Sequence, residues 1–219
     1  MTIQFNSMTT IREIEQKCSV CGKPSPQRMI GSTSTWGYPD LDLRPAEMKR
    51  SSMFAWLMEC PHCGYVSGSF RAKTGITEDF LKGEEYLNCR GFEFESGLAE
   101  KFFRAYLIAE KRGDSKRCFH NLLHCAWACD DAKDSNAKKI RMLALSYIDN
   151  LEYSEDEKKN YLCIKSDLLR RSGQFERVVE EFKDIIIGEE IYDKVINFQI
   201  EKAGKKDTAC YTVEDVIKP

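Results

Sequence analysis

The pattern of apolar positions divides the chain near residue 77. Before that point, short β-branched and aromatic runs alternate with turn residues, a pattern with period two that is typical of strands. Residues 1–17 are polar, and Ile11 and Ile14 predict either one helical turn or an edge strand there. The strands expected further on cover 28–35, 53–59 and 65–70.

From Thr77 the apolar period becomes 3.6, which predicts helices. Thr77 is expected to cap the first of them and Ser154 to open a capping box, while 212–215 suits one last turn. We expect helices over 78–88, 97–112, 115–131, 136–150, 155–172, 175–187 and 189–203. The sequence therefore predicts an α+β chain, with a small β module over 1–76 and an all-α domain over 77–219.

Two Cys-x-x-Cys-Gly motifs lie in the β module, Cys18/Cys21 and Cys60/Cys63. Two residues between cysteines let both thiolates face one ion, and paired motifs of this kind typically hold a tetrahedral Zn²⁺. Two unrelated thiol pairs, or a redox pair, would not explain the duplication. Because four thiolates leave no open coordination position, we expect one structural zinc in a zinc ribbon, although the stretch 22–59 is longer than a compact ribbon loop.

The segment 40–50 between the motifs alternates acidic, basic and apolar residues. One interpretation is a structured excursion in which aspartates and arginines pair with each other and with the backbone. Another is a recognition surface for a peptide or an anionic group, and a metal or catalytic role for Asp40 and Asp42 is the weakest alternative. The candidate contact residues of the recognition surface are Trp36, Tyr38, Arg44, Lys49 and Arg50.

The stretch 168–182 has the sequence pattern of a helical hairpin, in which an apolar helix ends at Gly173 and an aromatic residue begins the next helix. This resembles a tetratricopeptide repeat, with departures at Lys165, where leucine is usual, and at Val178, where alanine is usual. A looser copy turns at Gly113. The array is thus tetratricopeptide-like and irregular.

Three features of the chain together resemble an uncharacterised bacterial family. They are the helical hairpin, the segment 40–51 and the two cysteine motifs, of which the second has the sequence Cys-Pro-His-Cys-Gly-Tyr over 60–65. That family combines a zinc ribbon with tetratricopeptide-like helices. The resemblance supports the predicted fold and implies no particular activity.

Three cysteines and two histidines fall within the predicted helix 115–131. At about 100° per residue, Cys118, Cys125 and Cys129 form one stripe, whereas His120 and His124 lie on the far side. One helix cannot direct both sets at one ion. We therefore expect the cysteines to fill small apolar positions and the histidines to be ordinary surface or groove residues.

Signatures of catalysis are scarce. The chain shows no phosphate loop, nucleophile elbow or dinucleotide fingerprint. His62 is expected to point away from the zinc, and a Cys/His nucleophile pair would require the fold to bring Cys89 or Cys163 to a histidine. We accordingly predict a protein that is not an enzyme.

The composition favours a soluble globular protein, with 42% hydrophobic and 31% charged residues, a net charge of −2 and a pI of about 6.0. The N-terminus lacks a signal-peptide pattern and no apolar run would span a bilayer, so we expect a cytoplasmic protein without membrane attachment. The predicted function is protein or peptide binding. The alternative is RNA or DNA binding through the ribbon, where seven basic residues stand against four acidic ones over 18–73. These residues sum to +3, and a zinc ion with four thiolates contributes −2, so the net charge of the ribbon is about +1. A charge this small does not favour contacts with phosphates.

Overall fold

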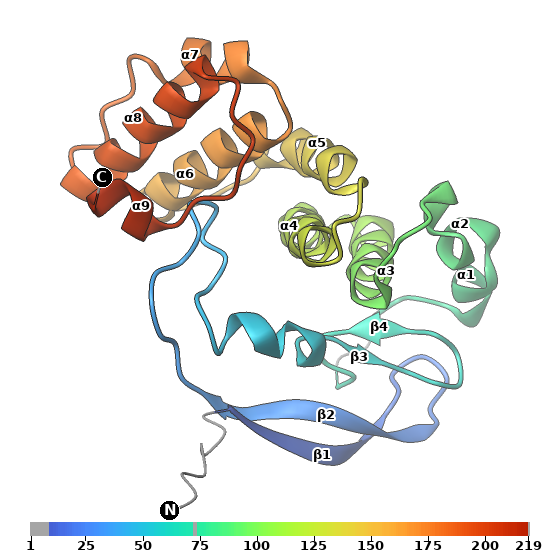
Figure 1. The fold of residues 1–219 in the computed structure, drawn as a ribbon. Coiled ribbons are helices and arrows are strands. Elements are labelled where there is room, and N and C mark those ends of the chain that lie inside the picture. The colour runs from blue at the N-terminus through green and yellow to red at the C-terminus, as the bar shows by residue number, and fades with distance from the viewer. Residues whose placement is uncertain (1–8, 72–73, 219) are drawn as a thin grey trace, which may run out of the picture. The chain divides into compact units, whose positions relative to one another are not determined.

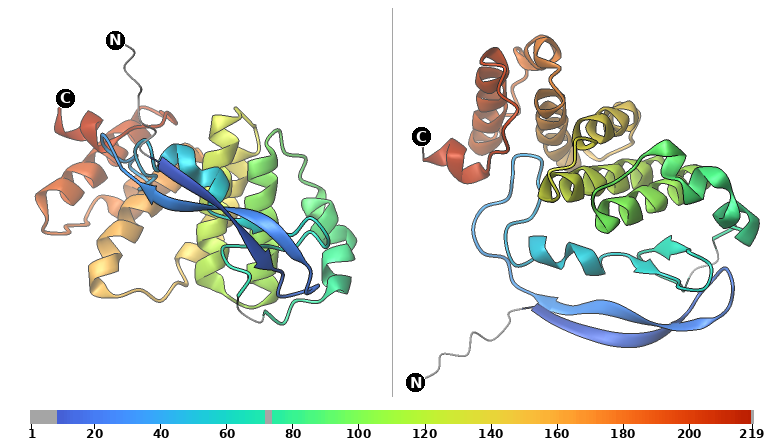
Figure 2. Two further views of the ribbon diagram at one scale, coloured as in Figure 1. Left: turned by 90° about the horizontal axis from the view of Figure 1, so that it is seen from below. Right: turned by 45° about the vertical axis from the view of Figure 1, so that its right-hand side comes forward.

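The computed structural model describes residues 9–71 and 74–218, and the chain forms two compact units. Unit 1 comprises Met1–Gly37 and Pro45–Glu93, and unit 2 comprises Tyr38–Arg44 and Phe94–Pro219. Strands come first and helices follow, so the predicted α+β class is confirmed (Figures 1 and 2).

The division into units differs from the predicted boundary between 1–76 and 77–219 in two places. Residues 77–93 belong to unit 1, although they begin the helical part of the sequence. Tyr38–Arg44, which we call the strap, lies between the two cysteine motifs in sequence and yet belongs to unit 2. Unit 2 is therefore built from two separate stretches of the chain.

Over the described residues 9–37, 45–71 and 74–93, unit 1 contains two antiparallel strand pairs. Its elements in chain order are β1 (Thr9–Lys17), β2 (Pro24–Thr33), the 3₁₀ helix η1 (Arg50–Ala55), β3 (Met58–Glu59), β4 (Val66–Ser67), α1 (Glu78–Lys82), α2 (Glu84–Leu87) and the 3₁₀ helix η2 (Cys89–Gly91). β1 pairs with β2 and β3 pairs with β4. β1 pairs in register Ile14 with Gln27 and has a bulge between Thr10 and Ile11. Of the two alternatives for the N-terminal stretch, the strand is therefore the correct one for residues 9–17.

Two local predictions in unit 1 are wrong. Residues 53–55 are not extended but lie in η1, where the hydroxyl of Ser52 donates to the carbonyl of Lys49 and accepts from the indole of Trp56. The expected helix 78–88 is interrupted at Gly83, whose ψ of 145° is extended. Thr77 caps α1 as predicted, because its side chain accepts from the amide of residue 80.

Unit 2 is an array of helices, and its members are α3 (Gly97–Lys111), α4 (Ser115–Asp131), α5 (Ala137–Ile148), α6 (Glu155–Arg171), α7 (Phe175–Phe182), α8 (Glu190–Gly204) and α9 (Val213–Ile217). The predicted capping box at Ser154 is present. α3 packs on α4, α4 on α5, and α6 on both α7 and α8. Within the described part of the chain, no helix has both the length and the apolar content that a bilayer crossing requires.

Four helices of unit 2 end in the same way, at a residue with positive φ: Gly113, Lys133, Gly173 and Lys206. In each case the amide of the following residue donates to a carbonyl five positions earlier, as in the bond from Gln174 to Leu169 at 2.9 Å. This Schellman arrangement satisfies carbonyls that the helix leaves open and turns the chain back. Glycine adopts it without strain at two of the four positions.

The hairpin of α6 and α7 buries the residues that its pattern predicts. Leu168, Leu169, Val178 and Phe182 are all 2% exposed or less. Lys165, which departs from the repeat pattern, forms ion pairs with carboxylates from the α5–α6 connection and from α7 at 2.5 and 2.6 Å. A charged residue at this position is therefore held by pairing, where leucine would be held by burial.

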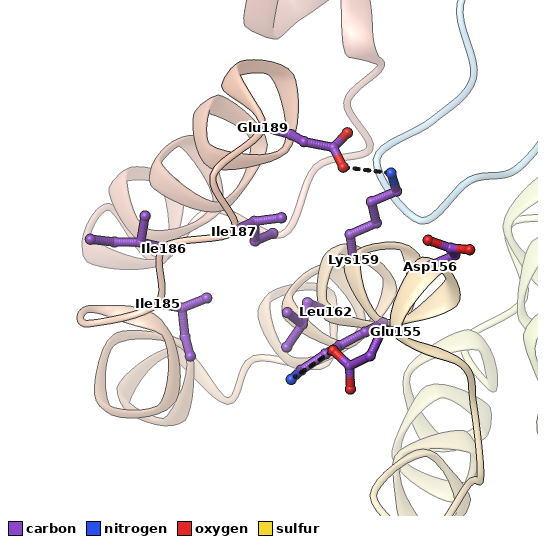
Figure 3. Close-up of a pocket in the computed structure, with 9 residues that line it drawn as sticks. Glu155, Asp156, Lys159, Leu162, Ile185, Ile186, Ile187 and Glu189 are labelled. Atoms are coloured by element: carbon purple, nitrogen blue, oxygen red, sulfur yellow. Dashed lines mark hydrogen bonds and ion pairs between the residues drawn. The ribbon is translucent and has the colours of Figure 1, made fainter.

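The connection between α7 and α8 contains three consecutive isoleucines, of which Ile185 and Ile186 are exposed and Ile187 is half-buried. The predicted helix 175–187 stops at Phe182, and the amides of Ile187 and Gly188 bind the carboxylate of Asp193 instead of continuing the helix. Ile185, Ile186 and Ile187 line a groove of about 310 Å³ with Leu162 and a charged rim of α6 (Figure 3). The side chain of Ile186 is 86% exposed.

Candidate functional site

The two cysteine motifs adopt the same backbone geometry. The amide of Gly22 donates to the carbonyl of Cys18 at 3.0 Å, and that of Gly64 donates to Cys60 at 2.9 Å. In both motifs the amide of the first cysteine also donates to the carbonyl of the residue after the glycine. Both glycines have a φ near +70°, at 72° and 73°, a conformation that side chains rarely adopt. Each turn therefore points two sulfurs the same way.

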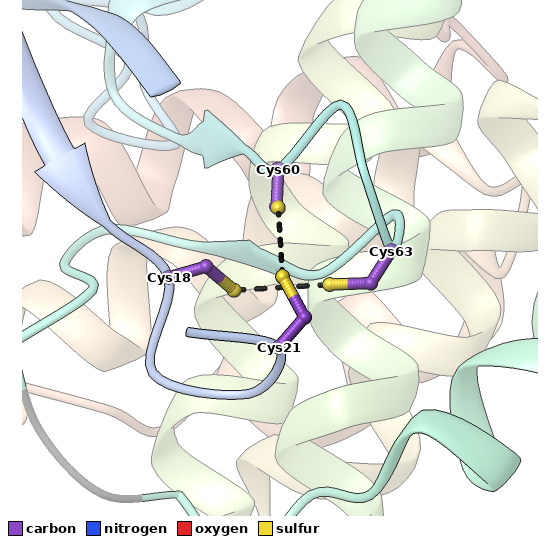
Figure 4. A group of neighbouring side chains, drawn as sticks. All are labelled: Cys18, Cys21, Cys60 and Cys63. Atoms are coloured by element: carbon purple, nitrogen blue, oxygen red, sulfur yellow. Dashed lines mark hydrogen bonds between the residues drawn. The ribbon is translucent and has the colours of Figure 1, made fainter. Parts of the chain in front are cut away.

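The four sulfurs from these turns face a common centre (Figure 4). The Sγ atoms lie 3.7 Å apart between Cys18 and Cys63 and 3.6 Å apart between Cys21 and Cys60, and all four lie within 4.8 Å of one another. A regular tetrahedron with metal–sulfur bonds of about 2.3 Å has edges of about 3.8 Å. A disulfide would bring two sulfurs to about 2.05 Å, so these are four separate thiols.

Gln27 of β2 holds the second motif beside the first. Its amide group donates to the carbonyl of Glu59 at 3.0 Å and accepts from the amide of Glu59 at 3.2 Å, one residue before Cys60. Gln27 is 7% exposed, so both bonds are shielded from water. His62 is exposed, and its Nε2 lies 3.2 Å from the carbonyl of Pro24. It does not join the sulfurs, in agreement with the prediction.

Burial favours the neutral form of two of the four thiols. Burial raises the pKa of Cys18 and of Cys63. At Cys21 burial also acts to raise the pKa, but the amide of Lys23 and the neighbouring thiols together lower it. A divalent ion at the centre would convert all four groups to thiolates and release their protons.

The chemistry of the donors identifies the class of metal. Four thiolates in a tetrahedron select zinc or iron over harder cations. Because the protein supplies all four ligands, a bound ion has no position for water or substrate. Among residues 9–71 and 74–218, this is the one group of three or more His, Cys, Asp or Glu side chains whose ligand atoms converge.

The helical cysteines lie in the core of unit 2. Cys118, Cys125 and Cys129 are 1%, 0% and 0% exposed, and the thiol of Cys125 donates to the carbonyl of Ala99 at 3.3 Å. Burial raises the pKa of Cys118 to about 11 and, at another buried position, that of Cys163 to about 12. Such thiols are protonated and unreactive at neutral pH.

The helical histidines are packed among aromatic rings. The ring of His124 lies 4.9 Å from that of Trp127, 5.3 Å from Phe102 and 6.3 Å from His120. Burial, with a smaller contribution from His120, lowers the pKa of His124 to about 3. Nε2 of His120 lies 3.3 Å from the hydroxyl of Tyr161. These are neutral packing residues, and the half-buried His124 lies beside Trp127 on the side of the helix away from the cysteines, which agrees with the predicted surface or groove position.

The strap is the feature that sequence reasoning misplaced. Trp36 and Tyr38 are exposed, at 61% and 39%, but Asp42 and Arg44 are buried, at 0% and 4%. The prediction that Arg44 belongs to an exposed contact surface is therefore wrong. Its guanidinium pairs with Asp131 at 2.5 Å, since a helix of unit 2 offers a carboxylate that the sequence pattern did not reveal.

The carboxylate of Asp42 enters a buried cluster of charges in unit 2. It accepts from the indole of Trp127 at 2.7 Å and lies 3.7 Å from Arg171, which also pairs with Asp130 at 2.9 Å and with Asp167 at 3.9 Å. Burial raises the pKa of Asp42 to about 6; Asp167 adds to this effect and Arg171 opposes it. The cluster is thus a built polar core, and only the alternation of charges over 40–50 hinted at it.

Comparison with known proteins returned no match: no protein-family model, curated protein or solved structure is similar to this chain.

Proposed function

We propose that this chain is a zinc-containing protein–protein interaction protein without enzymatic activity. In this proposal one zinc ion bound to Cys18, Cys21, Cys60 and Cys63 holds unit 1 together, and the tetratricopeptide-like helices of unit 2 bind a protein or peptide in the cytoplasm. The resemblance to the uncharacterised bacterial family with a zinc ribbon and such helices is part of the same proposal.

The arrangement of the four sulfurs carries the first half of the proposal. Their separations of 3.6 and 3.7 Å match the edges of a zinc–thiolate tetrahedron within about 0.2 Å. A closed site of this kind stabilises a fold and performs no chemistry on a substrate. Zinc is preferred over iron because a ribbon of paired Cys-x-x-Cys turns is a common zinc module.

The isoleucine groove supports the second half. An apolar side chain that is 86% exposed, as Ile186 is, remains in contact with water unless a partner covers it. Contiguous exposed apolar surface rimmed by charges is typical of interaction sites. Here Lys159 and Glu189 form such a rim, with their charged atoms 2.6 Å apart (Figure 3).

Metal analysis tests the closed site. We expect one zinc per chain by elemental analysis, and X-ray absorption should show four sulfur neighbours at about 2.3 Å. An oxygen or nitrogen neighbour would mean an open site and would reopen the case for catalysis. Iron in place of zinc would refute the assignment of the metal.

Partner capture tests the interaction role. The wild-type chain and the variant Ile186→Ser are compared in affinity capture from native extract, and Asp184→Asn serves as a control on the same exposed connection. We expect a partner retained by the wild type and by Asp184→Asn and lost by Ile186→Ser. Equal capture by all three would exclude the groove as the binding surface.

Nucleic-acid binding remains the alternative function. Two of the seven basic residues counted over 18–73 are engaged within the protein, since Arg44 pairs with Asp131 and Arg50 donates to the carbonyl of Pro45 at 2.9 Å. Asp131 offsets the charge of Arg44, and the bond to Pro45 occupies one donor of Arg50, so fewer basic groups of this stretch are available to phosphates. RNA or DNA affinity that falls steeply with salt would promote the alternative over the main proposal.

A further inference from the structure

The strap is held on unit 2 in the way that a bound peptide is held. Its backbone pairs with the segment before α9: the amide of Leu41 donates to the carbonyl of Tyr211 at 3.0 Å, and the amide of Val213 donates to that of Pro39 at 2.9 Å. Extended peptides commonly bind by such main-chain pairing, with side chains entering separate pockets. Leu41, whose amide makes one of these bonds, is 1% exposed.

The strap is also shaped as a compact turn before it meets unit 2. The amide of Asp40 donates to the carbonyl of Arg44 at 3.0 Å, and the amide of Leu43 donates back to Asp40 at 2.9 Å. The carboxylate of Asp42 accepts from the amide of Arg44 at 3.2 Å. A short segment that forms these bonds on its own loses less conformational entropy on binding.

The strap and the part of unit 2 that it contacts, which we call the seat and which includes Trp127, Asp131 and Arg171, carry complementary charges. The indole of Trp127 and the guanidinium of Arg171 face the carboxylate of Asp42, while Asp131 faces the guanidinium of Arg44. The seat thus offers a donor pair for one carboxylate and an acceptor for one cation two residues further on. These features define a ligand by its chemistry.

Some polar groups at the contact between the strap and the seat are poorly stabilised. Burial raises the pKa of Asp42 to about 6, so its carboxylate is less stable at this position than it would be in water. Two buried atoms of the same cluster, Nε of Arg171 and Oδ2 of Asp167, lack a hydrogen-bond partner among the described residues. Incompletely satisfied polar groups weaken docking, and this favours a segment that can be displaced.

We propose that the seat of the strap on unit 2 is a peptide-binding site, that the strap occupies it as an internal ligand, and that the external ligand is a turn-forming peptide with a leucine, an aspartate and, two residues later, an arginine. The inference rests on the proposed binding role of unit 2. It concerns a surface other than the isoleucine groove, so each can fail without the other. A tethered strap acts at an effective concentration of the order of millimolar. A competing peptide can bind only those chains whose strap has left the seat, so its apparent Kd is its intrinsic Kd divided by the fraction of such chains.

Binding of a synthetic peptide tests this inference. The probe is a fluorescent, terminally capped peptide with the sequence of residues 36–46, and it is titrated with the full-length chain by anisotropy. The strap variant carries Leu41→Ser and Asp42→Ser, which leave the loop length unchanged. We expect this variant to bind the probe at least about tenfold more tightly than the wild type, because its own strap no longer competes.

Two controls define the specificity. Asp184→Asn, with its change at an exposed carboxylate of another connection, should bind the probe as the wild type does. A probe that itself carries Leu41→Ser should bind the strap variant at least about tenfold more weakly than the original probe, because it lacks the apolar side chain that the strap buries. Zinc content is measured in the same samples, so that loss of the metal site is seen separately from loss of peptide binding.

A second measurement decides the case in which the strap variant does not fold. An aspartate-directed endoprotease should cut the wild-type chain at Asp40 or Asp42 faster as unlabelled probe is added, because displacement exposes the strap. A folded, zinc-containing strap variant that does not bind millimolar probe would overturn the inference and leave a purely structural strap. A cleavage rate independent of the probe would do the same for the wild-type chain.

Discussion

Two buried groups of unit 2 should make its stability depend on pH in opposite directions. The pKa of His124 falls from 6.5 to about 3 in the folded chain because burial disfavours the cation. Between these values the unfolded chain binds a proton that the folded chain does not, so the free energy of unfolding falls as the pH falls. Taking 1.36 kcal/mol per pKa unit, the loss between pH 7.5 and pH 5 is about 2 kcal/mol.

Asp42 acts with the opposite sign. Burial raises its pKa from 3.8 to about 6, so between these values the folded chain binds the additional proton and gains stability as the pH falls. The corresponding gain between pH 7.5 and pH 5 is about 1 kcal/mol. In the wild type the two effects oppose each other, and single substitutions should separate them.

Urea unfolding followed by circular dichroism at the two pH values measures this separation. Relative to wild type, the free energy of unfolding of His124→Phe should rise by about 2 kcal/mol on acidification, whereas that of Asp42→Asn should fall by about 1 kcal/mol. Acid effects on the metal site are common to all three chains and cancel in the comparison. Parallel pH profiles for wild type and both variants would refute the reasoning, since neither group would then change its proton affinity on folding.

Four further substitutions test the fold and the metal site. Cys60→Ser should abolish stoichiometric zinc and unfold residues 18–70, as elemental analysis and proteolysis would report, because metal binding and folding are coupled in such modules; a stable chain with one zinc would contradict this. Cys125→Ala should keep one zinc and reduce stability by about 1–2 kcal/mol in urea unfolding, and a lower zinc count would show that the helical cysteines bind metal. Gln27→Ala should speed zinc transfer to a chelator and reduce stability by about 1–3 kcal/mol, since it leaves two backbone groups of a neighbouring strand without partners; an unchanged transfer rate would argue against the clamp. Gly173→Ala should lower the melting temperature because φ is +81° there, and an unchanged value would mean that the turn relaxes.

The sequence predicts best where the structure depends on local patterns. The helices α3 to α6 were expected within two residues of their observed bounds, because periodic apolar positions and caps act within one element. Convergence of the four cysteines followed from the spacing of two turns. At Gly83 the same reasoning failed, since an extended residue interrupts a stretch whose apolar period continues.

The burial of charged residues in unit 2 could not be predicted, for a different reason. Asp130, Arg141 and Arg171 look like a solvated face when each helix is considered alone, yet Arg141 is 2% exposed and its guanidinium pairs with Asp130. Arg171 also lies 3.7 Å from Asp42, which is 129 positions away in sequence. Pairing over such a distance leaves no periodic signal. The alternation of charges in the strap indicates that these residues form pairs, but it does not indicate which residues they pair with.

The discontinuous make-up of unit 2 has a consequence for how the chain is made. Residues 38–44 leave the ribosome early, whereas the carbonyl of Tyr211 and the amide of Val213 that pair with them follow about 170 residues later. At 5–20 residues per second this interval lasts roughly 8–34 s. During that time the backbone bonds of Pro39 and Leu41 have no partner, and a nascent chain stalled before residue 211 would hold the strap only through its side-chain contacts with α4 and α6.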